Sequence, residues 1–112
     1  MAIWPTFADS TANLAGAATF TGTARGAISG GTSLYNNFNA HFISDQISAS
    51  NGARIEWSLD GSTNWRICGQ TTLAVSTPAI LSVPVTFPFY RVILVNGATI
   101  TTALSITSSF TE

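Results

Sequence analysis

The sequence contains no lysine and few charged residues of any kind. Four arginines and five acidic residues leave a formal net charge of −1, and charged residues make up only 8% of the chain. Ordinary globular domains contain about a quarter. A nucleic-acid-binding protein needs a basic stripe to displace counterions from phosphates, and anionic membranes attract clusters of basic residues. The composition therefore argues against nucleic acid and membrane as partners.

Cysteine and histidine each occur once, as Cys68 and His41. A single cysteine excludes an intrachain disulfide, and in a strand it is usually a small buried hydrophobe. A lone histidine without a cysteine cluster predicts no zinc site. Asp45 follows His41 by four residues, which on an extended strand separates them by about 13 Å. The pair therefore does not predict catalysis.

Other features typical of enzymes are also missing. The five carboxylates are scattered along the chain, and there is no Gly-rich phosphate loop or nucleophile elbow. We therefore expect a non-enzymatic protein with no catalytic residues, no metal and no cofactor.

Long apolar runs are absent. No segment approaches the roughly 20 apolar residues that span a membrane. The N-terminus, MAIWPTFADS, lacks the basic start and apolar middle of a signal peptide. We expect the chain to fold in the cytoplasm of the cell that makes it and to act where its assembly goes.

Ser, Thr and turn residues are abundant instead. Ser and Thr number 29 of 112 residues, and pairs such as Asn51-Gly52, Asp60-Gly61 and Asn96-Gly97 separate short runs rich in Val, Ile, Thr and aromatic residues. This pattern is typical of antiparallel sandwiches and barrels. We predict an all-β, jelly-roll-like antiparallel β-sandwich of about eight strands. At most a helical turn or two is expected, between Asp9 and Ala18.

The first 22 residues differ from the rest. Their apolar residues, among them Ile3, Trp4 and Phe7, follow no two-residue alternation. We divide the chain into an extended N-terminal segment, residues 1–22, and a β-sandwich domain, residues 23–112. The segment either adds an edge strand to its own sheet or lies as an arm against a neighbouring subunit.

The stretch RIEWSLDGSTNWRICG, residues 54–69, allows a register prediction. A five-residue loop from Asp60 to Asn64 separates apolar from polar side chains, whereas a two-residue turn mixes them. The longer loop predicts three opposed pairs that place both tryptophans in the core: Leu59 with Trp65, Trp57 with Ile67, and Ile55 with Gly69. Glu56 and Arg66 then share the other face and can interact. Cys68 lies on that face too, where a covering layer or a subunit must hide it.

A second hairpin is predicted over residues 89–106, with its turn at Asn96-Gly97. A three-residue loop, 95–97, gathers one apolar set on a single face: Tyr90, Val92, Leu94, Ile100, Leu104 and Ile106. Phe89 and Ile93 fall on the opposite face beside Arg91. The first strand of this hairpin should therefore be central, with its second face covered by a loop, the N-terminal segment or another subunit.

Two further strands can be assigned faces or positions. Within residues 34–44, Phe38, Ala40 and Phe42 alternate with polar Asn37, Asn39 and His41. Pro84, within the run 80–87, predicts an edge strand or a bulge because proline cannot donate to a ladder.

A saccharide site is the one ligand site that the residues leave open. Aromatic faces with amide and hydroxyl donors could come from Trp4, Tyr35, Asn36, Asn37 and Asn39. The same residue types also form turns and subunit contacts.

Residues 53–107 carry a resemblance to a known class of protein. The pattern IEWSLDGSxNW, followed by SVPVTFPFYRVILVNGATITTALSI, resembles small bacteriophage virion proteins with β-sandwich domains. These include capsid decoration (cement) proteins and modules of baseplates and tail fibres. The same hairpins are also similar to jelly-roll modules of the galactose-binding type.

The resemblance implies a protein on the virion, at the capsid surface. It implies a homo-oligomer, with a trimer favoured, that binds the major capsid protein and stabilises contacts between capsomers. A short chain beginning at Met1 favours such a stand-alone protein over a module of a long fibre. Candidate contact residues are Ile3, Trp4, Phe7 and Arg91. The alternatives are a receptor- or glycan-binding module of a phage tail or head fibre, and a cellular structural or adhesion domain.

Overall fold

The computed structural model describes residues 5–29, 32–33 and 35–112. Every regular element among them is a β-strand, which confirms the predicted all-β class. The helical turns predicted between Asp9 and Ala18 are not formed, because Asp9 and Ser10 belong to a strand, and irregular chain with a turn at 16–17 follows. The strands are β1 (Thr6–Ser10), β2 (Thr19–Thr21), β3 (Arg25–Gly26), β4 (Ile28–Ser29), β5 (Thr32–Ser33), β6 (Asn37–Ser44), β7 (Ser48–Ser58), β8 (Arg66–Thr71), β9 (Ala79–Pro84), β10 (Phe89–Asn96) and β11 (Leu104–Thr111).

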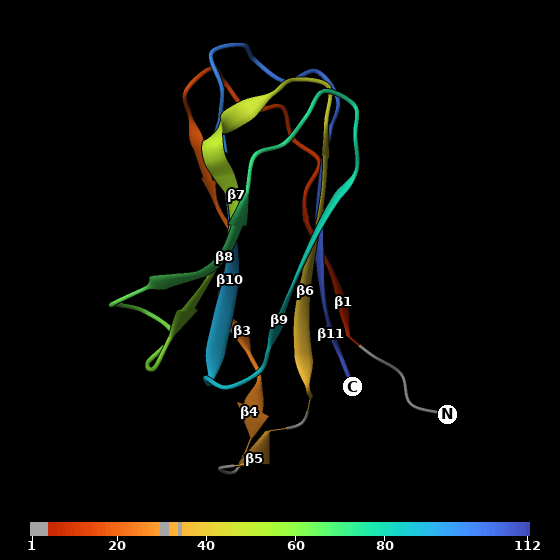
Figure 1. Cartoon of the computed structure of the whole chain (residues 1–112). Coiled ribbons are helices and arrows are strands. Elements are labelled where there is room, and N and C mark those ends of the chain that lie inside the picture. The colour runs from red at the N-terminus through yellow and green to blue at the C-terminus, as the bar shows by residue number, and fades with distance from the viewer. Residues whose placement is uncertain (1–4, 30–31, 34) are drawn as a thin grey trace.

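Nine of these strands form two antiparallel sheets packed as a sandwich, as predicted (Figure 1). The four-stranded sheet has the order β1-β11-β6-β9. The five-stranded sheet has the order β2-β10-β7-β8, and β3 also pairs with β10. The remaining strands, β4 and β5, form a small hairpin at one end of the sandwich (Figure 1).

The core lies between the two sheets and is built by period-two alternation on their inner faces. Phe38, Ala40 and Phe42 of β6 are buried, as predicted, and His41 between them is exposed. Phe38 stacks on Tyr90 of the other sheet, with ring centroids 5.3 Å apart, and contacts Phe110 at 4.9 Å. This aromatic cluster joins the two sheets across the core.

The first predicted hairpin exists, but a bulge changes its register. Ile55 pairs with Gly69, as predicted; beyond it Glu56 pairs with Ile67, and Trp57 pairs with Arg66 rather than Ile67. The extra residue on β8 moves Ile67 away from the core, and its side chain is 46% exposed. Because side chains alternate, a shift of one residue reverses their faces.

The predicted hairpin over residues 89–106 is wrong. β10 belongs to the five-stranded sheet and β11 to the four-stranded sheet, so Asn96-Gly97 begins a crossover between sheets. The alternation itself holds for Val92, Leu94, Leu104 and Ile106, which are buried, whereas Ile100 is exposed. β10 is central, as predicted, and Ile93 on its outer face is buried.

Residues 6–10 of the N-terminal segment add an edge strand to their own sheet, which was one of the two predicted alternatives. β1 is an edge strand that pairs with β11, and β2 pairs with β10 in the other sheet. At this edge Arg25 of β3 and Asp9 of β1 form an ion pair of 2.9 Å that links the two sheets. β9 is the opposite edge strand of the four-stranded sheet, as Pro84 predicts.

Candidate functional site

The predicted contact residues do not form one cluster in the described part of the chain. Ile3 and Trp4 lie outside the described residues. Phe7 is half-buried: its ring meets Phe110 edge-on at 6.2 Å, and the Arg25 guanidinium lies 4.1 Å from its centroid. Phe7 therefore packs within its own chain, on the edge opposite the hairpin loop described below.

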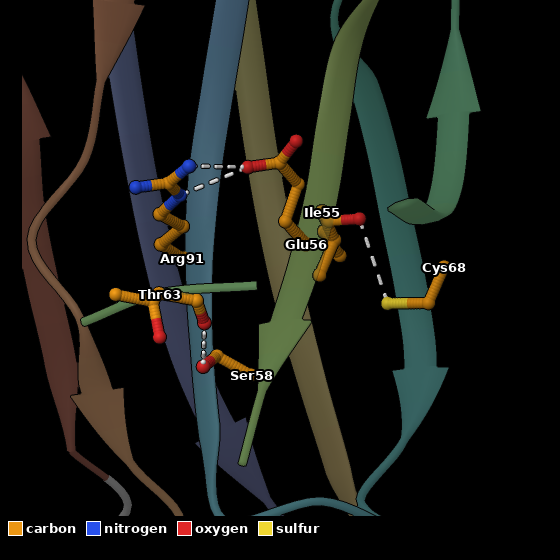
Figure 2. A network of polar contacts seen from close by, with 6 residues as sticks. All are labelled: Ile55, Glu56, Ser58, Thr63, Cys68 and Arg91. Carbon is orange, nitrogen blue, oxygen red and sulfur yellow. Dashed lines mark hydrogen bonds and ion pairs between the residues drawn. The ribbon is translucent and has the colours of Figure 1, made fainter. Parts of the chain in front are cut away.

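Arg91 lies on the outer face of the five-stranded sheet, where it is held from two sides. Its Nη2 and Nε atoms bind Glu56 Oε1 at 2.8 and 2.9 Å (Figure 2), and its guanidinium stacks 4.2 Å from the centroid of Trp65. Glu56 therefore pairs with Arg91 across the sheet, and the predicted interaction with Arg66 is wrong. Trp65 also leaves the core, contrary to the prediction, because the bulge places it on this outer face.

The loop between β7 and β8 is fixed by a dense polar network. The buried Ser58 hydroxyl bonds Thr63 O at 2.7 Å (Figure 2) and accepts from the backbone N–H groups of Asp60 and Gly61. The Asp60 carboxylate accepts from Ser62 N and Thr63 N, and from Thr63 Oγ1 at 2.6 Å. These hydrogen bonds, those from Thr63 above all, hold the pKa of Asp60 well below its usual range.

A groove of about 230 Å³ opens beside this loop, lined by Trp57, Leu59, Asp60, Thr63, Asn64 and Arg66. Trp57 forms an aromatic part of its wall, with its indole stacked on Phe87 at 3.6 Å between centroids and 7° between planes. Leu59, predicted in the core, is 68% exposed. Sequence reasoning missed this groove because it placed both tryptophans on one buried face.

Among the residues that the structure describes, no charged side chain lies on the outer face of the four-stranded sheet. The strand registers place these residues on it: Thr6, Ala8, Asn37, Asn39, His41, Ile43, Ile80, Ser82, Pro84, Ser105, Thr107, Ser109 and Thr111. We call this set the uncharged face. The alternation in residues 37–44 and 105–111, together with the lack of acidic and basic residues there, could have identified it from the sequence.

The uncharged face is shallowly hollowed and contains exposed apolar groups. A depression of about 150 Å³ lies on it, lined in part by His41, Ile43 and Thr107. A larger one of about 330 Å³ lies at the end of the face, where Asp45 is among its lining residues. Ile43 and Ile80 are 40% and 64% exposed. Asn39 ties three strands together, because its Nδ2 donates to Thr111 Oγ1 at 3.0 Å and its Oδ1 accepts from Ser82 Oγ at 2.6 Å.

Asp45, the residue next to this face, fastens the loop that leads into β11. Its Oδ1 accepts from Thr102 N and Ala103 N at 2.9 and 3.1 Å, and its Oδ2 accepts from Thr102 Oγ1. These hydrogen bonds, with that from the Thr102 hydroxyl first, lower the pKa of Asp45 to about 2. The Asp45 carboxylate thus holds this loop through Thr102 and Ala103 and does not pair with His41.

The lowered pKa of Asp45 predicts a pH dependence of stability. A depressed folded-state pKa adds stability that is present above the unfolded value of about 3.9 and is lost as the pH falls toward 2. We expect the wild-type melting temperature to fall more steeply between pH 4 and pH 2 than that of Asp45→Asn. Thermal unfolding followed by circular dichroism measures both slopes, and equal slopes would refute this role.

Neither a metal site nor a membrane-spanning helix is found in the described part of the chain. No group of three or more His, Cys, Asp or Glu side chains gathers there. No helix in those residues is long and apolar enough to cross a bilayer.

Comparison with known families identifies the domain. The family model described as "Uncharacterised protein YqxG N-terminal domain" matches residues 3–111. The chain belongs to this family. No curated protein matches the chain.

A solved structure shares the fold of this chain. The crystal structure of the PBSX exported protein XepA has a TM-score of 0.82 and 15% sequence identity to it. The match covers 96% of this chain and 37% of XepA. The domain thus spans little more than a third of that neighbour's length, and the likeness at this identity concerns the fold.

The structure also shows where the predicted saccharide-binding residues and Cys68 lie. Among the proposed saccharide-binding residues, Asn37 and Asn39 lie on the uncharged face, whereas the Tyr35 ring stacks on Phe110 at 5.0 Å. Cys68 is exposed at the edge strand β8, so no covering layer of its own chain hides it, and cover by another subunit stays a prediction. Its Sγ lies 3.5 Å from Ile55 O, and desolvation, followed by the Glu56 charge, raises the pKa of the thiol to about 11. Such a thiol is a poor nucleophile at neutral pH.

Proposed function

We propose that this domain is a non-enzymatic structural part of a phage protein, and that it acts as a capsid decoration protein on the phage head. The sequence resemblance to virion β-sandwiches supports this role. The fold it shares with XepA, an exported protein of the phage PBSX, is consistent with a phage protein. In this role the partner is the major capsid protein, and neither nucleic acid nor membrane is bound.

The observation that carries the proposal is the uncharged face. Its groups are hydroxyls, amides, an imidazole and the exposed side chains of Ile43 and Ile80. Burying such groups against another protein avoids the large desolvation cost of burying charges, and the buried centres of interfaces are depleted in charged residues. A sheet face with this composition is suited to contact another protein.

The face is also rigid before it binds. It lies on four paired strands, and the Asn39 side chain links β6 to β9 and β11 through hydrogen bonds. A contact made by a pre-organised surface loses less conformational entropy when it forms. The uncharged face can therefore bind without an ordering step.

One charged group, Asp45, lies at the end of this face, where Thr102 and Ala103 bind its carboxylate. Charged groups on the other sheet give the domain an orientation. Arg54, Glu56 and Arg91 are on the outer face of the five-stranded sheet, and Asp60 and Arg66 are at its hairpin. We infer that the uncharged face meets the capsid protein and the five-stranded sheet faces outward. A homotrimer would multiply these contacts through effective concentration, and Ile3 and Trp4 remain candidate contacts of the N-terminal segment.

A charge placed at the centre of the uncharged face tests the proposal. His41 is exposed and lies between Ile80 and Thr107 on neighbouring strands, so His41→Glu should fold normally. We expect it to weaken binding to expanded heads of the cognate phage at least about tenfold, or about 1.4 kcal/mol, because the new carboxylate is desolvated on docking. Co-sedimentation with purified heads measures the affinity.

Gln70→Glu is the matched control. Gln70 is exposed in a strand of the other sheet, opposite Arg54, and the substitution changes the charge by the same amount. It should leave the affinity unchanged. Equal binding by wild type and His41→Glu would refute this face as the contact, and failure of the wild type to bind heads would refute the decoration role.

A further inference from the structure

The groove at the β7–β8 hairpin is a second, separate surface that capsid docking does not use. It lies at the end of the five-stranded sheet, away from the uncharged face of the four-stranded one. We propose that this groove binds one neutral sugar ring of a larger glycan. The six residues that would form this glycan groove are Trp57, Leu59, Asp60, Thr63, Asn64 and Arg66.

The size of the groove limits the ligand. Its volume of about 230 Å³ is smaller than the pockets of about 300–1,000 Å³ that enclose drug-sized ligands. A single ring fits this scale, and the open sides leave room for the rest of a saccharide chain to continue into solvent. An extended peptide needs a longer channel with repeated side-chain pockets.

The chemistry of the lining favours a sugar over other ligands of that size. Trp57 supplies an aromatic surface against which the C–H groups of a pyranose can pack, while its stacking on Phe87 fixes the indole. Asp60, Asn64 and Arg66 supply planar carboxylate, amide and guanidinium groups, which suit the vicinal hydroxyls of a sugar ring. A purely apolar ligand would cover the Arg66 guanidinium without giving it a hydrogen-bond partner.

The charges in the groove point to a neutral sugar. Arg66 forms no ion pair or side-chain hydrogen bond in the described part of the chain, so its guanidinium is available. Asp60 places a negative charge in the same groove, which opposes the arginine charge. The groove thus has no excess positive charge with which to select a phosphate or an acidic sugar.

The glycan groove is pre-formed. Ser58 and Asp60 together hold Thr63 through its backbone N–H, its carbonyl and its hydroxyl. Gly61 and Asn64 adopt φ values of 76° and 56°, which set the path of the loop between these anchors. A fixed loop lowers the entropy cost of binding, which matters for a ligand with few contacts.

The indole signals of two of the three tryptophans provide the test. Trp57 lines the groove, whereas Trp65 lies on the outer face of the sheet beneath Arg91. We expect titration with neutral monosaccharides and their oligomers, selected from hits on a glycan array, to shift the indole N–H resonance of Trp57 and to leave that of Trp65 in place. The resonances are assigned with Trp57→Phe and Trp65→Phe.

Variants at the rim of the groove separate specific binding from general effects. Arg66 is exposed and Asn64 has a φ that glycine adopts readily, so Arg66→Ala and Asn64→Gly should fold. Each should weaken saccharide binding at least about tenfold, whereas Gln70→Ala, outside the groove, should not. The proposal would be overturned if no neutral glycan of the array bound. It would also be overturned if binding shifted the Trp65 resonance and both rim variants left the affinity unchanged. Neither result bears on binding to phage heads.

Discussion

Asn96→Asp is expected to lower the free energy of unfolding strongly at neutral pH, although it changes a single side-chain atom. Asn96 is buried, and its Nδ2 lies 2.9 to 3.0 Å from three carbonyl oxygens, those of Leu14, Ala15 and Thr99. An aspartate would point a carboxylate oxygen at these carbonyls, and its buried charge would keep only the hydrogen bond that the Gly97 N–H now donates to Asn96 Oδ1. Such changes cost about 3–5 kcal/mol, a large part of the roughly 5–15 kcal/mol that stabilises a domain.

The effect of Asn96→Asp should depend on pH in a defined direction. Burial among carbonyls raises the folded-state pKa of the introduced carboxyl above its unfolded value of about 3.9. The loss of stability relative to wild type is therefore full above the folded pKa and shrinks as the pH falls toward 3.9. The protonated acid can again donate one of the hydrogen bonds.

Asn51→Asp provides a matched control within the same chain. Asn51 also precedes a glycine, but it is exposed, and the hydrogen bond it forms with Thr72 uses its backbone N–H. We expect its free energy of unfolding to change by less than about 0.5 kcal/mol. Urea unfolding of the three proteins measures the difference, and equal stability of the two aspartate variants would show that the Asn96 network contributes little.

Breaking the ion pair between β1 and β3 should have the second largest effect. The Asp9 side chain is 2% exposed, and it pairs with Arg25, which is 21% exposed. Asp9→Ala leaves the arginine partly buried without its partner, and Arg25→Ala leaves a buried carboxylate and an uncovered Phe7 ring. We expect each single variant to lose about 3–5 kcal/mol.

Replacing both partners should cost much less. Asp9 Oδ2 and Arg25 Nε make no hydrogen bond in the described part of the chain, so the pair is incompletely satisfied. Asp9→Leu with Arg25→Met should therefore recover most of the lost stability, as apolar replacements of buried pairs often do. Chemical unfolding of the wild type, the single variants and the double variant measures these free energies in a double-mutant cycle.

The Glu56–Arg91 pair is the natural comparison for this cycle. Its carboxylate side chain is 13% exposed, against 2% for Asp9. Glu56→Gln keeps the shape of the side chain and should cost only about 1 kcal/mol. If Asp9→Ala cost no more than Glu56→Gln, the link between the two sheets would not be a major source of stability.

Alternation along single strands was predicted well from the sequence. The buried side of residues 37–42 and the buried residues of β10 and β11 follow from the spacing of Phe, Val, Leu and Ile. The edge position of β9 follows from Pro84, whose missing N–H limits pairing. These features depend on residues near one another in the chain, which is why the sequence alone contains them.

Strand pairing was predicted less well because it depends on distant residues. Asn96-Gly97 is a strong local turn signal, yet the Asn96 side chain binds carbonyls of residues 14 and 15, more than 80 positions away. That contact favours a crossover between sheets over a hairpin. The bulge at Cys68 likewise has no local signature, and it moved Trp65 and Ile67 off the face assigned to them.

The candidate site was also hard to predict, because it depends on strand pairing. The groove could not be predicted because it exists only once the bulge separates Trp57 from Trp65. Phe7 and Arg91, predicted as contacts, are engaged with Arg25 and Glu56 inside the chain. The uncharged face, by contrast, combines two local features, the alternation and the absence of charge.

Hydroxyl-radical footprinting of the protein on phage heads tests the central claim most directly. The reactive side chains His41 and Ile80 are exposed on the uncharged face, while Ile67 and Leu59 are exposed at the five-stranded sheet and its hairpin. Docking through the uncharged face predicts that His41 and Ile80 lose most of their oxidation on binding, whereas Ile67 and Leu59 keep theirs. Protection of Ile67 and Leu59 with undiminished oxidation of His41 and Ile80 would contradict it.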